Sequence, residues 1–314
     1  MHIISVLNLT LKQILFYIYK AEKFKKENII RDSLKNKTLI NIFFEPSTRT
    51  SCSFQAAMIK LGGNVINITE NISSVMKGES LEDTIKTVTN YGDIIALRHP
   101  QKGSAEIAAK VSSIPVINAG DGNGEHPTQA LLDIFTIKTE LMKFNLDICS
   151  PYRSNIVLTF VGDLKNSRTI HSLIHVLCLF PEISFNFIHP KGLEMPIEII
   201  NKLNWHNICF IEGKTLEEAL PNTDVLYVTR IQKERFETEQ EYNTIMLENN
   251  YIINNRILLY AKPQMIIMHP LPRLNEIAVE VDRDPRAVYF EQVKNGVFMR
   301  MAILDNLLNN IITI

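Results

Sequence analysis

The sequence predicts an α/β protein made of two doubly wound parallel-sheet domains that are joined by long helices. In both halves of the chain, short apolar runs typical of buried strands alternate with amphipathic helical patterns, which indicates parallel sheets flanked by helices. A polar, turn-rich segment at residues 145–154 separates the two series, and 314 residues suffice for two domains with separate cores. Because ligands of such sheets bind beside the carboxyl ends of the strands, we expect the functional site in a cleft between the domains.

The first half of the chain begins with an amphipathic pattern and then alternates. Polar residues interrupt the apolar N-terminal stretch well before the ~20 residues that a membrane span needs, so this stretch predicts an amphipathic helix. Expected strands follow at residues 38–44, 64–68, 93–97 and 115–118. Helical patterns cover residues 50–61, 80–91 and 103–112. Pro127 then suits the first turn of a long helix that reaches about residue 142.

The second half repeats the alternation, which predicts a second parallel sheet. Its expected strands are residues 155–161, 183–188, 208–211, 224–228 and 265–268. Its expected helices lie near residues 167–179, 194–203 and 251–261. A final long helix is expected from residue 284 to about residue 308.

The composition excludes several classes of function. The net charge of −1 argues against nucleic acid or a membrane surface as the main partner, because both favour proteins with a basic excess. The four cysteines lack Cys-x-x-Cys spacing, which indicates reduced intracellular thiols rather than a zinc site or disulfides. With no secretory signal, a cytoplasmic location is expected, although a leader removed from a longer precursor would leave the same chain.

Residues 45–50, Glu-Pro-Ser-Thr-Arg-Thr, form the most informative stretch. They join a predicted strand to a predicted helix, which Gly62 and Gly63 then end. Such a junction presents free backbone N–H groups and the positive end of a helix dipole, and here three hydroxyls and the Arg49 guanidinium are added. The combination favours binding of a phosphate-like anion. The alternative is a capped helix with an incidental surface arginine.

Further polar motifs follow other predicted strands. They are Arg98-His99-Pro100, His126-Pro127-Thr128-Gln129, Asp163 to Arg168, Arg230 to Arg235, and His269-Pro270-Leu271-Pro272. A glycine-rich loop, such as residues 120–125, can expose backbone donors, but this one lacks the spaced Gly-x-Gly-x-x-Gly of dinucleotide binding. The Pro-Leu-Pro run lacks N–H donors at its prolines, so its rigid carbonyl groups are expected to point into the cleft.

Together these motifs resemble the aspartate transcarbamoylase (aspartate carbamoyltransferase) catalytic subunit family, from His2 to the last helix. The resemblance rests on Ser47-Thr48-Arg49-Thr50, Lys77-Gly78-Glu79, Arg98-His99-Pro100, His126 to Gln129, Arg230-x-Gln232-x-x-Arg235 and His269 to Pro272. It implies the carbamoyltransferase fold, with a carbamoyl-phosphate-binding domain at residues 1–134 plus 285–314 and an aspartate-binding domain at residues 135–284. It also implies transfer of the carbamoyl group of carbamoyl phosphate to L-aspartate in pyrimidine biosynthesis, which gives N-carbamoyl-L-aspartate and phosphate.

The resemblance also implies a role for each site residue. The phosphate would be held by Ser47, Thr48, Arg49 and Thr50. The carbonyl oxygen of carbamoyl phosphate would face Thr50, Arg98 and His126, and its amino group would face Gln129 and the backbone of Leu271 and Pro272. The aspartate carboxylates would be bound by Lys77, Arg168, Arg230 and Gln232. Ser73 and Lys77 would come from a neighbouring subunit of a homotrimer, and Glu45 would pair with Arg168 and Arg235 when the domains close.

These roles agree with the chemistry of two mutually repelling acids, which fixed cations must gather. Attack of the amine on the carbamoyl carbon produces an oxyanion, and preplaced donors would stabilise it. No enzyme nucleophile, metal or cofactor is expected. Because nearby arginines disfavour its protonated form, His126 is expected to be a neutral imidazole that donates a hydrogen bond.

Three other functions remain as alternatives. Ornithine transcarbamoylase shares the phosphate motif, but its diamino acid substrate needs an acidic pocket and its motif reads His-Cys-Leu-Pro, whereas residue 270 is proline here. A non-catalytic subunit on the same fold would be expected to lack site arginines, yet all are in place. A nicotinamide-dependent oxidoreductase is suggested only by Val161-Gly162-Asp163, which lacks the further glycines of the fingerprint.

Two departures from the family pattern concern affinity and assembly. Ser51 stands where many relatives have arginine, which resembles the branch in which the enzyme is one domain of an animal-type multienzyme chain. Residues 165–167 precede Arg168 where glycine is commoner directly before the arginine. Neither departure removes a charge that faces substrate. The sequence identifies no regulatory partner.

Overall fold

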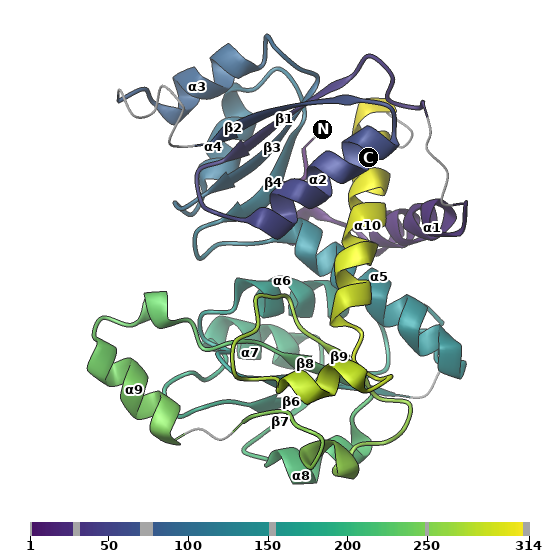
Figure 1. The fold of residues 1–314 in the computed structure, drawn as a ribbon, viewed down its shortest axis with the longest axis vertical. Helices are drawn as coiled ribbons and strands as arrows, with labels where there is room; N and C mark the ends of the chain where they lie inside the picture. Colours follow the sequence, from purple (N-terminus) through teal and green to yellow (C-terminus); the bar gives the residue numbers. More distant parts are fainter. Residues whose placement is uncertain (1, 28–31, 70–77, 151–154, 249–250, 310–314) are drawn as a thin grey trace. The chain divides into compact units, whose positions relative to one another are not determined.

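A computed structural model describes residues 2–27, 32–69, 78–150, 155–248 and 251–309. The chain divides into two compact units, Met1–Phe135 with Val293–Ile314 and Thr136–Gln292. Each unit contains one parallel sheet flanked by helices (Figure 1), so the predicted fold class is confirmed. Both boundaries fall inside long helices, α5 (Pro127–Leu141) and α10 (Tyr289–Asn309). No helix in the described ranges is long and apolar enough to cross a membrane.

The sheet of the first unit has the strand order β2-β1-β3-β4, with every neighbouring pair parallel. Its strands are β1 (Thr38–Phe43), β2 (Asn64–Thr69), β3 (Ile94–His99) and β4 (Val116–Asp121). From β1 the chain moves to β2 on one side and then returns to the other side of β1 for β3. The carboxyl ends of β1 and β3 therefore flank the topological switch point, where doubly wound sheets bind ligands.

Helices cover both faces of this first sheet. They are α1 (Leu11–Glu27), α2 (Thr48–Lys60), α3 (Leu81–Val88) and α4 (Ser104–Val111), together with parts of α5 and α10. Because the crossovers run in opposite directions, α2 lies on one face and α3 with α4 on the other (Figure 1). On the second of these faces, Ile85 and Val88 of α3 pack with Ile40 and Ile42 of β1 in a buried core.

The sheet of the second unit has the strand order β7-β6-β5-β8-β9, again with parallel neighbours. Its strands are β5 (Ile156–Val161), β6 (Ile183–Ile188), β7 (Cys209–Glu212), β8 (Val225–Val228) and β9 (Ile266–Met268). The chain runs from β5 outward to β7 and then crosses back to β8. The switch point of this sheet therefore lies between the carboxyl ends of β5 and β8.

The helices of the second unit are shorter and include several 3-10 turns. The α-helices are α6 (Arg168–Leu177), α7 (Ile197–Trp205), α8 (Leu216–Ala219) and α9 (Glu239–Glu248). The 3-10 turns are η4 (Met142–Phe144), η5 (Leu220–Asn222), η6 (Lys233–Arg235), η7 (Ile257–Tyr260) and η8 (Val279–Arg283), and η1 (Val6–Asn8) lies in the first unit.

Two helix predictions fail in the second half of the chain, and two short helices were not predicted. The helix expected at residues 251–261 is wrong, because Ile253 forms a β-bridge with Ile277 and only the turn η7 follows. The last helix begins at Tyr289 rather than at residue 284, since Ile267 of β9 first pairs with the extended backbone at Arg286. Helices α8 and α9 were not predicted.

Candidate active site

The predicted anion-binding residues of the first unit lie at the switch point of its sheet. Phe43 of β1 pairs with Arg98 of β3, and the Phe44 N–H donates to the Arg98 carbonyl at 2.9 Å. The next few residues lead into α2, which begins at Thr48. The phosphate-type motif and Arg98 thus occupy the edge of the sheet where ligands are expected.

The start of α2 leaves several donors available to an anion. Ser47 is the N-cap residue, but its side chain does not cap the helix. The N–H groups of Thr48, Arg49 and Thr50 belong to the first turn, where a helix provides no acceptor for them. Thr50 is buried, with 6% of its surface exposed, whereas Thr48 and Arg49 are exposed. An anion here would also meet the positive end of a 13-residue helix dipole.

Arg98 is a buried cation held by a carboxylate. Its Nη2 donates to Glu45 Oε1 at 2.8 Å. Burial lowers the pKa of Arg98, as does the nearby charge of Arg49, while Glu45 opposes both effects. Arg49 itself lies in the first turn of α2. Two such cations beside a helix N-terminus suit an anion with more than one negative charge.

The start of α5 adds two buried polar side chains to the first unit. His126 directly precedes the helix, and its carbonyl accepts from the Gln129 N–H at 3.0 Å. The side chains of His126 and Gln129 are 4% and 9% exposed. Gln129 Nε2 donates to Asp133 Oδ1 at 2.9 Å, which fixes the direction of its amide group. The neutral imidazole expected at His126 stays a prediction.

Several backbone donors of the glycine-rich loop at residues 120–125 bind acceptors within the protein. Asp121 organises the loop, because its carboxylate accepts from the Glu125 N–H at 2.8 Å and its carbonyl accepts from the Gly124 N–H at 2.7 Å. Gly122 N–H donates to the His99 carbonyl at 2.8 Å. The loop therefore supports His126 rather than offering these N–H groups to a ligand.

The switch point of the second sheet brings two loops into close contact. Gly162 has φ +117°, and a Cβ atom there would lie 2.1 Å from the Thr229 carbonyl oxygen, so only glycine is accommodated. Asp163 is fully buried and accepts from the Asn166 N–H at 2.9 Å. Burial raises the pKa of Asp163, although its hydrogen bonds oppose the shift. Gln232 Nε2 donates to the Asn166 carbonyl at 3.1 Å, so one loop fixes the other.

These two loops carry the predicted aspartate-binding residues. Arg168 is the first residue of α6, and Gln232 directly precedes η6. Arg230 donates to Glu234 through both terminal nitrogens, with Nη1 to Oε2 at 2.9 Å. These bonds raise the pKa of Arg230. Glu234 was not among the predicted site residues, although its position four residues after an arginine was a usable signal.

A third loop of the second unit, after β9, contains the predicted backbone contacts Leu271 and Pro272. The peptide bond between them is cis, and Leu271 has φ +54°. The Leu271 N–H donates to His269 Nδ1 at 2.8 Å. Since Nδ1 is an acceptor, Nε2 carries the proton and donates to Glu276 Oε1 at 2.8 Å. His269 and Glu276, which were not predicted as support, therefore hold this loop.

The remaining site predictions concern other segments. Ser73 and Lys77 lie outside the described residues. Arg235 is the last, exposed residue of η6, and its pairing with Glu45 and Arg168 stays a prediction. Among the described residues, no group of three or more His, Cys, Asp or Glu side chains has the geometry of a metal site.

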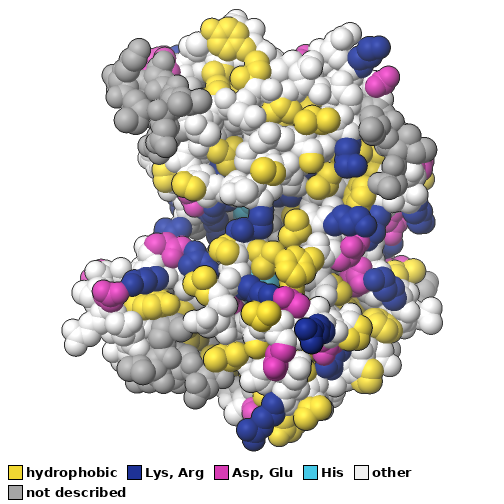
Figure 2. Space-filling model, in the orientation of Figure 1, with side chains coloured by type: hydrophobic (Ala, Val, Ile, Leu, Met, Phe, Trp, Pro, Cys, Tyr) yellow, Lys and Arg dark blue, Asp and Glu magenta, His cyan; other side chains and the backbone are white. Residues whose placement is uncertain are grey.

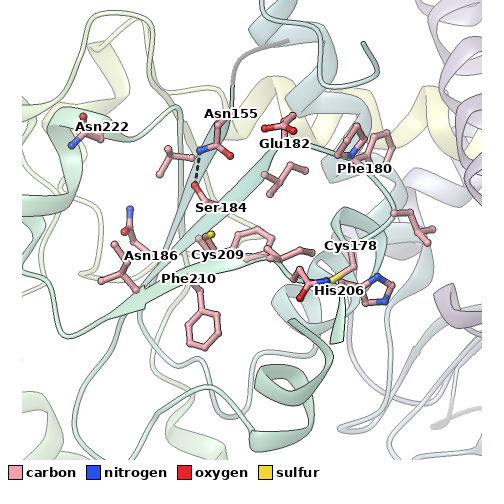
Figure 3. Close-up of a pocket in the computed structure, with 18 of the residues that line it drawn as sticks. Asn155, Cys178, Phe180, Glu182, Ser184, Asn186, His206, Cys209, Phe210 and Asn222 are labelled. Carbon is pink, nitrogen blue, oxygen red and sulfur yellow. Dashed lines mark hydrogen bonds between the residues drawn. The ribbon is translucent and has the colours of Figure 1, made fainter. Parts of the chain in front are cut away.

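The hollow drawn in close-up in Figure 3 is not at a switch point. It has a volume of about 650 Å³ and is lined by Asn155, Ser184 and Cys209 among others, near the amino ends of β5, β6 and β7 (Figure 3). Asn155 Nδ2 donates to Ser184 Oγ there at 2.8 Å. Ligands of doubly wound sheets bind at the opposite ends of the strands, so this hollow is not a candidate site.

The surface charge agrees with a small ligand. On the face of the second unit that Figure 2 shows, basic side chains lie among acidic ones. A nucleic-acid-binding surface would instead be uniformly basic.

Comparison with known families identifies the family of the chain. A model of the aspartate/ornithine carbamoyltransferase carbamoyl-P binding domain matches residues 1–139, and a model of the Asp/Orn binding domain matches residues 154–307. The chain belongs to the aspartate/ornithine carbamoyltransferase family. This membership confirms the predicted carbamoyltransferase fold.

Curated relatives of very different length are similar to this chain. The multifunctional protein CAD of Squalus acanthias is 48% identical over 98% of this chain, which spans 13% of that protein. The aspartate carbamoyltransferase catalytic subunit of Bifidobacterium adolescentis is 44% identical, over 96% of this chain and 92% of the relative. The chain thus resembles both one segment of a multifunctional protein and nearly all of a separate catalytic subunit.

Solved carbamoyltransferase structures are similar over almost the whole chain. The catalytic subunit of M. Jannaschii aspartate transcarbamoylase has a TM-score of 0.89 and 44% identity, and covers 99% of this chain and 98% of its own. The Trypanosoma cruzi aspartate transcarbamoylase in complex with carbamoyl phosphate and aspartate has a TM-score of 0.90 and 37% identity. The match covers 98% of this chain and 96% of the T. cruzi chain.

Proposed function

We propose that this chain is an aspartate carbamoyltransferase, which transfers the carbamoyl group of carbamoyl phosphate to the amine of L-aspartate in pyrimidine biosynthesis. The observation that carries the proposal is the position of the motif residues, which gather at the switch point of each of the two sheets. We call the residues of the first unit the phosphate half-site: Ser47, Thr48, Arg49, Thr50, Arg98, His126 and Gln129. We call those of the second unit the aspartate half-site: Arg168, Arg230 and Gln232.

The phosphate half-site is proposed to bind carbamoyl phosphate. The phosphate would accept from the first-turn N–H groups and hydroxyls of α2 and from Arg49. The carbonyl oxygen would accept from Thr50, Arg98 and His126, and the amino group would face Gln129 and the carbonyl groups of Leu271 and Pro272. The carbamoyl-phosphate domain is proposed as residues 1–134 plus 285–314, and the aspartate domain as residues 135–284.

The aspartate half-site is proposed to bind the two carboxylates of L-aspartate. Arg168 and Arg230 provide fixed cations, and Gln232 provides an amide. An acidic side-chain pocket, which a diamino acid would need, is not what these residues form. Basic groups at this position therefore favour aspartate over ornithine.

The proposed reaction proceeds without a covalent intermediate between substrate and protein. The amine of aspartate attacks the carbamoyl carbon, the tetrahedral oxyanion is stabilised by Thr50, Arg98 and His126, and the C–O bond to phosphate breaks. The proton released by the nitrogen passes to the departing phosphate, which is itself basic. Alignment of the two substrates supplies about 7–11 kcal/mol of barrier reduction in well-oriented reactions.

The proposed working unit is a cytoplasmic homotrimer whose sites include Ser73 and Lys77 of a neighbouring subunit. Mixing Lys77→Ala with Arg49→Ala, each inactive alone, tests this sharing. Hybrid trimers should recover activity, because some sites would take Arg49 and Lys77 from different chains. Subunit exchange without recovery would place Lys77 in the site of its own chain.

An assay of phosphate release tests the activity itself. With carbamoyl phosphate present, L-aspartate should support release and L-ornithine should not. Release with ornithine alone, or no release with either amino acid, would contradict the proposal. Arg49→Ala provides the background control.

A further inference from the structure

A buried carboxylate lies directly behind Gln129 in the phosphate half-site. Asp133 follows Gln129 by one turn of α5, and its side chain is fully buried. Its Oδ1 accepts from Gln129 Nε2 at 2.9 Å. A buried charge lowers stability unless other groups compensate it, so the Asp133 carboxylate beside Gln129 needs a compensating partner.

A buried arginine compensates this charge. Arg300 of α10 is 3% exposed, and the nearby Asp133 carboxylate attracts its positive charge. Its Nη1 donates to Ser53 Oγ of α2 at 3.0 Å, and its Nη2 approaches Thr128 Oγ1 of α5 at 3.3 Å. Arg300 therefore places a positive charge near Asp133 and links α10 to the two helices that carry the half-site.

An ionised carboxylate accepts hydrogen bonds but donates none. Of the two ends of the Gln129 amide, only the NH2 group suits Asp133. The opposite end, Oε1, is thus left as the acceptor, and no described residue donates a hydrogen bond to it. The amide direction follows from this network rather than from the shape of the side chain.

We propose that Asp133 is a specificity-determining positioning residue, which turns Gln129 Oε1 toward the amino group of carbamoyl phosphate. The inference rests on the proposed function and deepens it. An acyl phosphate with an amino group donates to Oε1, whereas one with a methyl group leaves this acceptor unpaired. The enzyme therefore selects carbamoyl over acetyl donors through a residue that does not touch the substrate.

The Asp133→Asn variant tests the proposal because asparagine presents either a donor or an acceptor. Its NH2 group can donate to Gln129 Oε1, which turns the glutamine amide round and points Nε2 at the substrate amino group. Two donors then face each other. Affinity for an amino-bearing ligand should fall, while affinity for its methyl counterpart should change little.

Calorimetry with phosphonoacetamide and acetonylphosphonate measures this effect directly, since the two probes differ only by NH2 against CH3. The wild-type protein should bind phosphonoacetamide ~10–100-fold more tightly. In Asp133→Asn this ratio should fall about tenfold, through loss of phosphonoacetamide affinity alone. Asp305→Asn is the matched control, since Asp305 is a buried carboxylate of the same unit that pairs with Lys20 at 2.6 Å. It should keep the wild-type ratio.

A double-mutant cycle with Gln129→Met separates positioning from a general structural effect. If Asp133 acts through Gln129, Asp133→Asn should not change the ratio in the Gln129→Met background. An unchanged ratio in Asp133→Asn alone, or an equal loss of affinity for both probes, would overturn the inference. If the wild-type protein already binds both probes equally, the proposed role of Gln129 fails instead.

A measurement on the unmutated protein covers the case in which Asp133→Asn does not fold. With 15N-labelled glutamine, the Gln129 side-chain NH2 signal is assigned by its absence in Gln129→Met. Its hydrogens should exchange slowly with solvent both with and without phosphonoacetamide, because they are bound to Asp133. Fast exchange that slows only when phosphonoacetamide is added would show that Nε2 faces the ligand, and would overturn the inference.

Discussion

Arg98 and Glu45 form a close ion pair within the first unit, with Nη2 donating to Oε1 at 2.8 Å. The pair joins the end of β3 to the loop that follows β1, so it spans the switch point of the sheet. It therefore holds one proposed catalytic cation in place beside the start of α2. The four predictions below concern the two half-sites and the stability of the second unit.

Replacing Arg98 with methionine should lower kcat about 100–1000-fold, because it removes a donor to the developing oxyanion. Steady-state assays of phosphate release measure the change. Lys37→Met is the matched control, since Lys37 pairs with Asp93 at 2.9 Å near the amino end of β1. Equal losses in both variants would show that the effect of Arg98 is structural.

Replacing Arg230 with methionine should raise the KM for L-aspartate about 10–100-fold, since a charged hydrogen-bond donor to the substrate is lost. Affinity for phosphonoacetamide should stay unchanged, because that probe occupies the phosphate half-site. Lys233→Met removes a neighbouring exposed cation and should alter neither quantity. A parallel loss of affinity for phosphonoacetamide would contradict the assignment.

The Gly162→Ala substitution should reduce the free energy of unfolding by about 3 kcal/mol or more. The new Cβ would clash with the Thr229 carbonyl, and the positive φ of residue 162 disfavours any side chain. Gly192→Ala separates the two causes. Gly192 also has positive φ, +88°, but has open space around its Cβ position, so it should cost only about 1 kcal/mol. Urea unfolding measures both, and similar costs would rule out the close approach.

Mild acid should destabilise the second unit through His175. Burial, helped by the charge of Lys202, lowers the pKa of His175 to about 4 from 6.5. Between these values the unfolded chain binds more protons, so stability should fall as pH drops from 6.5 toward 4. Partial exposure reduces the effect to about 1–2 kcal/mol.

Urea unfolding at pH 7 and pH 5 tests this dependence. His175→Gln should lose less stability between the two pH values than the wild type does. His206→Gln changes an exposed histidine at the end of α7 and should follow the wild type. A His175→Gln variant with the full acid sensitivity would assign the effect to other groups.

The sequence predicted the sheets and the junction between β1 and α2 because both follow from local signals. The nine strands at residues 38–268 are apolar runs, and every one was expected within a few residues. Hydroxyl residues marked the start of α2, and Gly62 marked its end. Gly62 has φ +82°, the left-handed conformation that commonly ends a helix. Placement of Arg168 at the start of α6 followed from the same reasoning.

The supporting contacts could not be predicted because they join distant segments. Arg300 lies 167 positions after Asp133, yet both sit in the core of one unit. The apolar run around Ile253 suggested a helix, but tertiary pairing with Ile277 prevailed over local periodicity. Tautomer and amide directions, as at His269 and Gln129, depend on such long-range partners.

The return of α10 to the first unit has a consequence for synthesis on the ribosome. Asp305 binds Lys20 at 2.6 Å, and Asn306 donates to the Tyr17 hydroxyl at 3.1 Å, so the last helix packs on the first. When residues 1–135 emerge, the helix that supplies Arg300 has not yet been translated. The first unit therefore cannot complete its fold until more than 150 further residues have been translated and α10 has emerged. The second unit is continuous in sequence and needs no later segment.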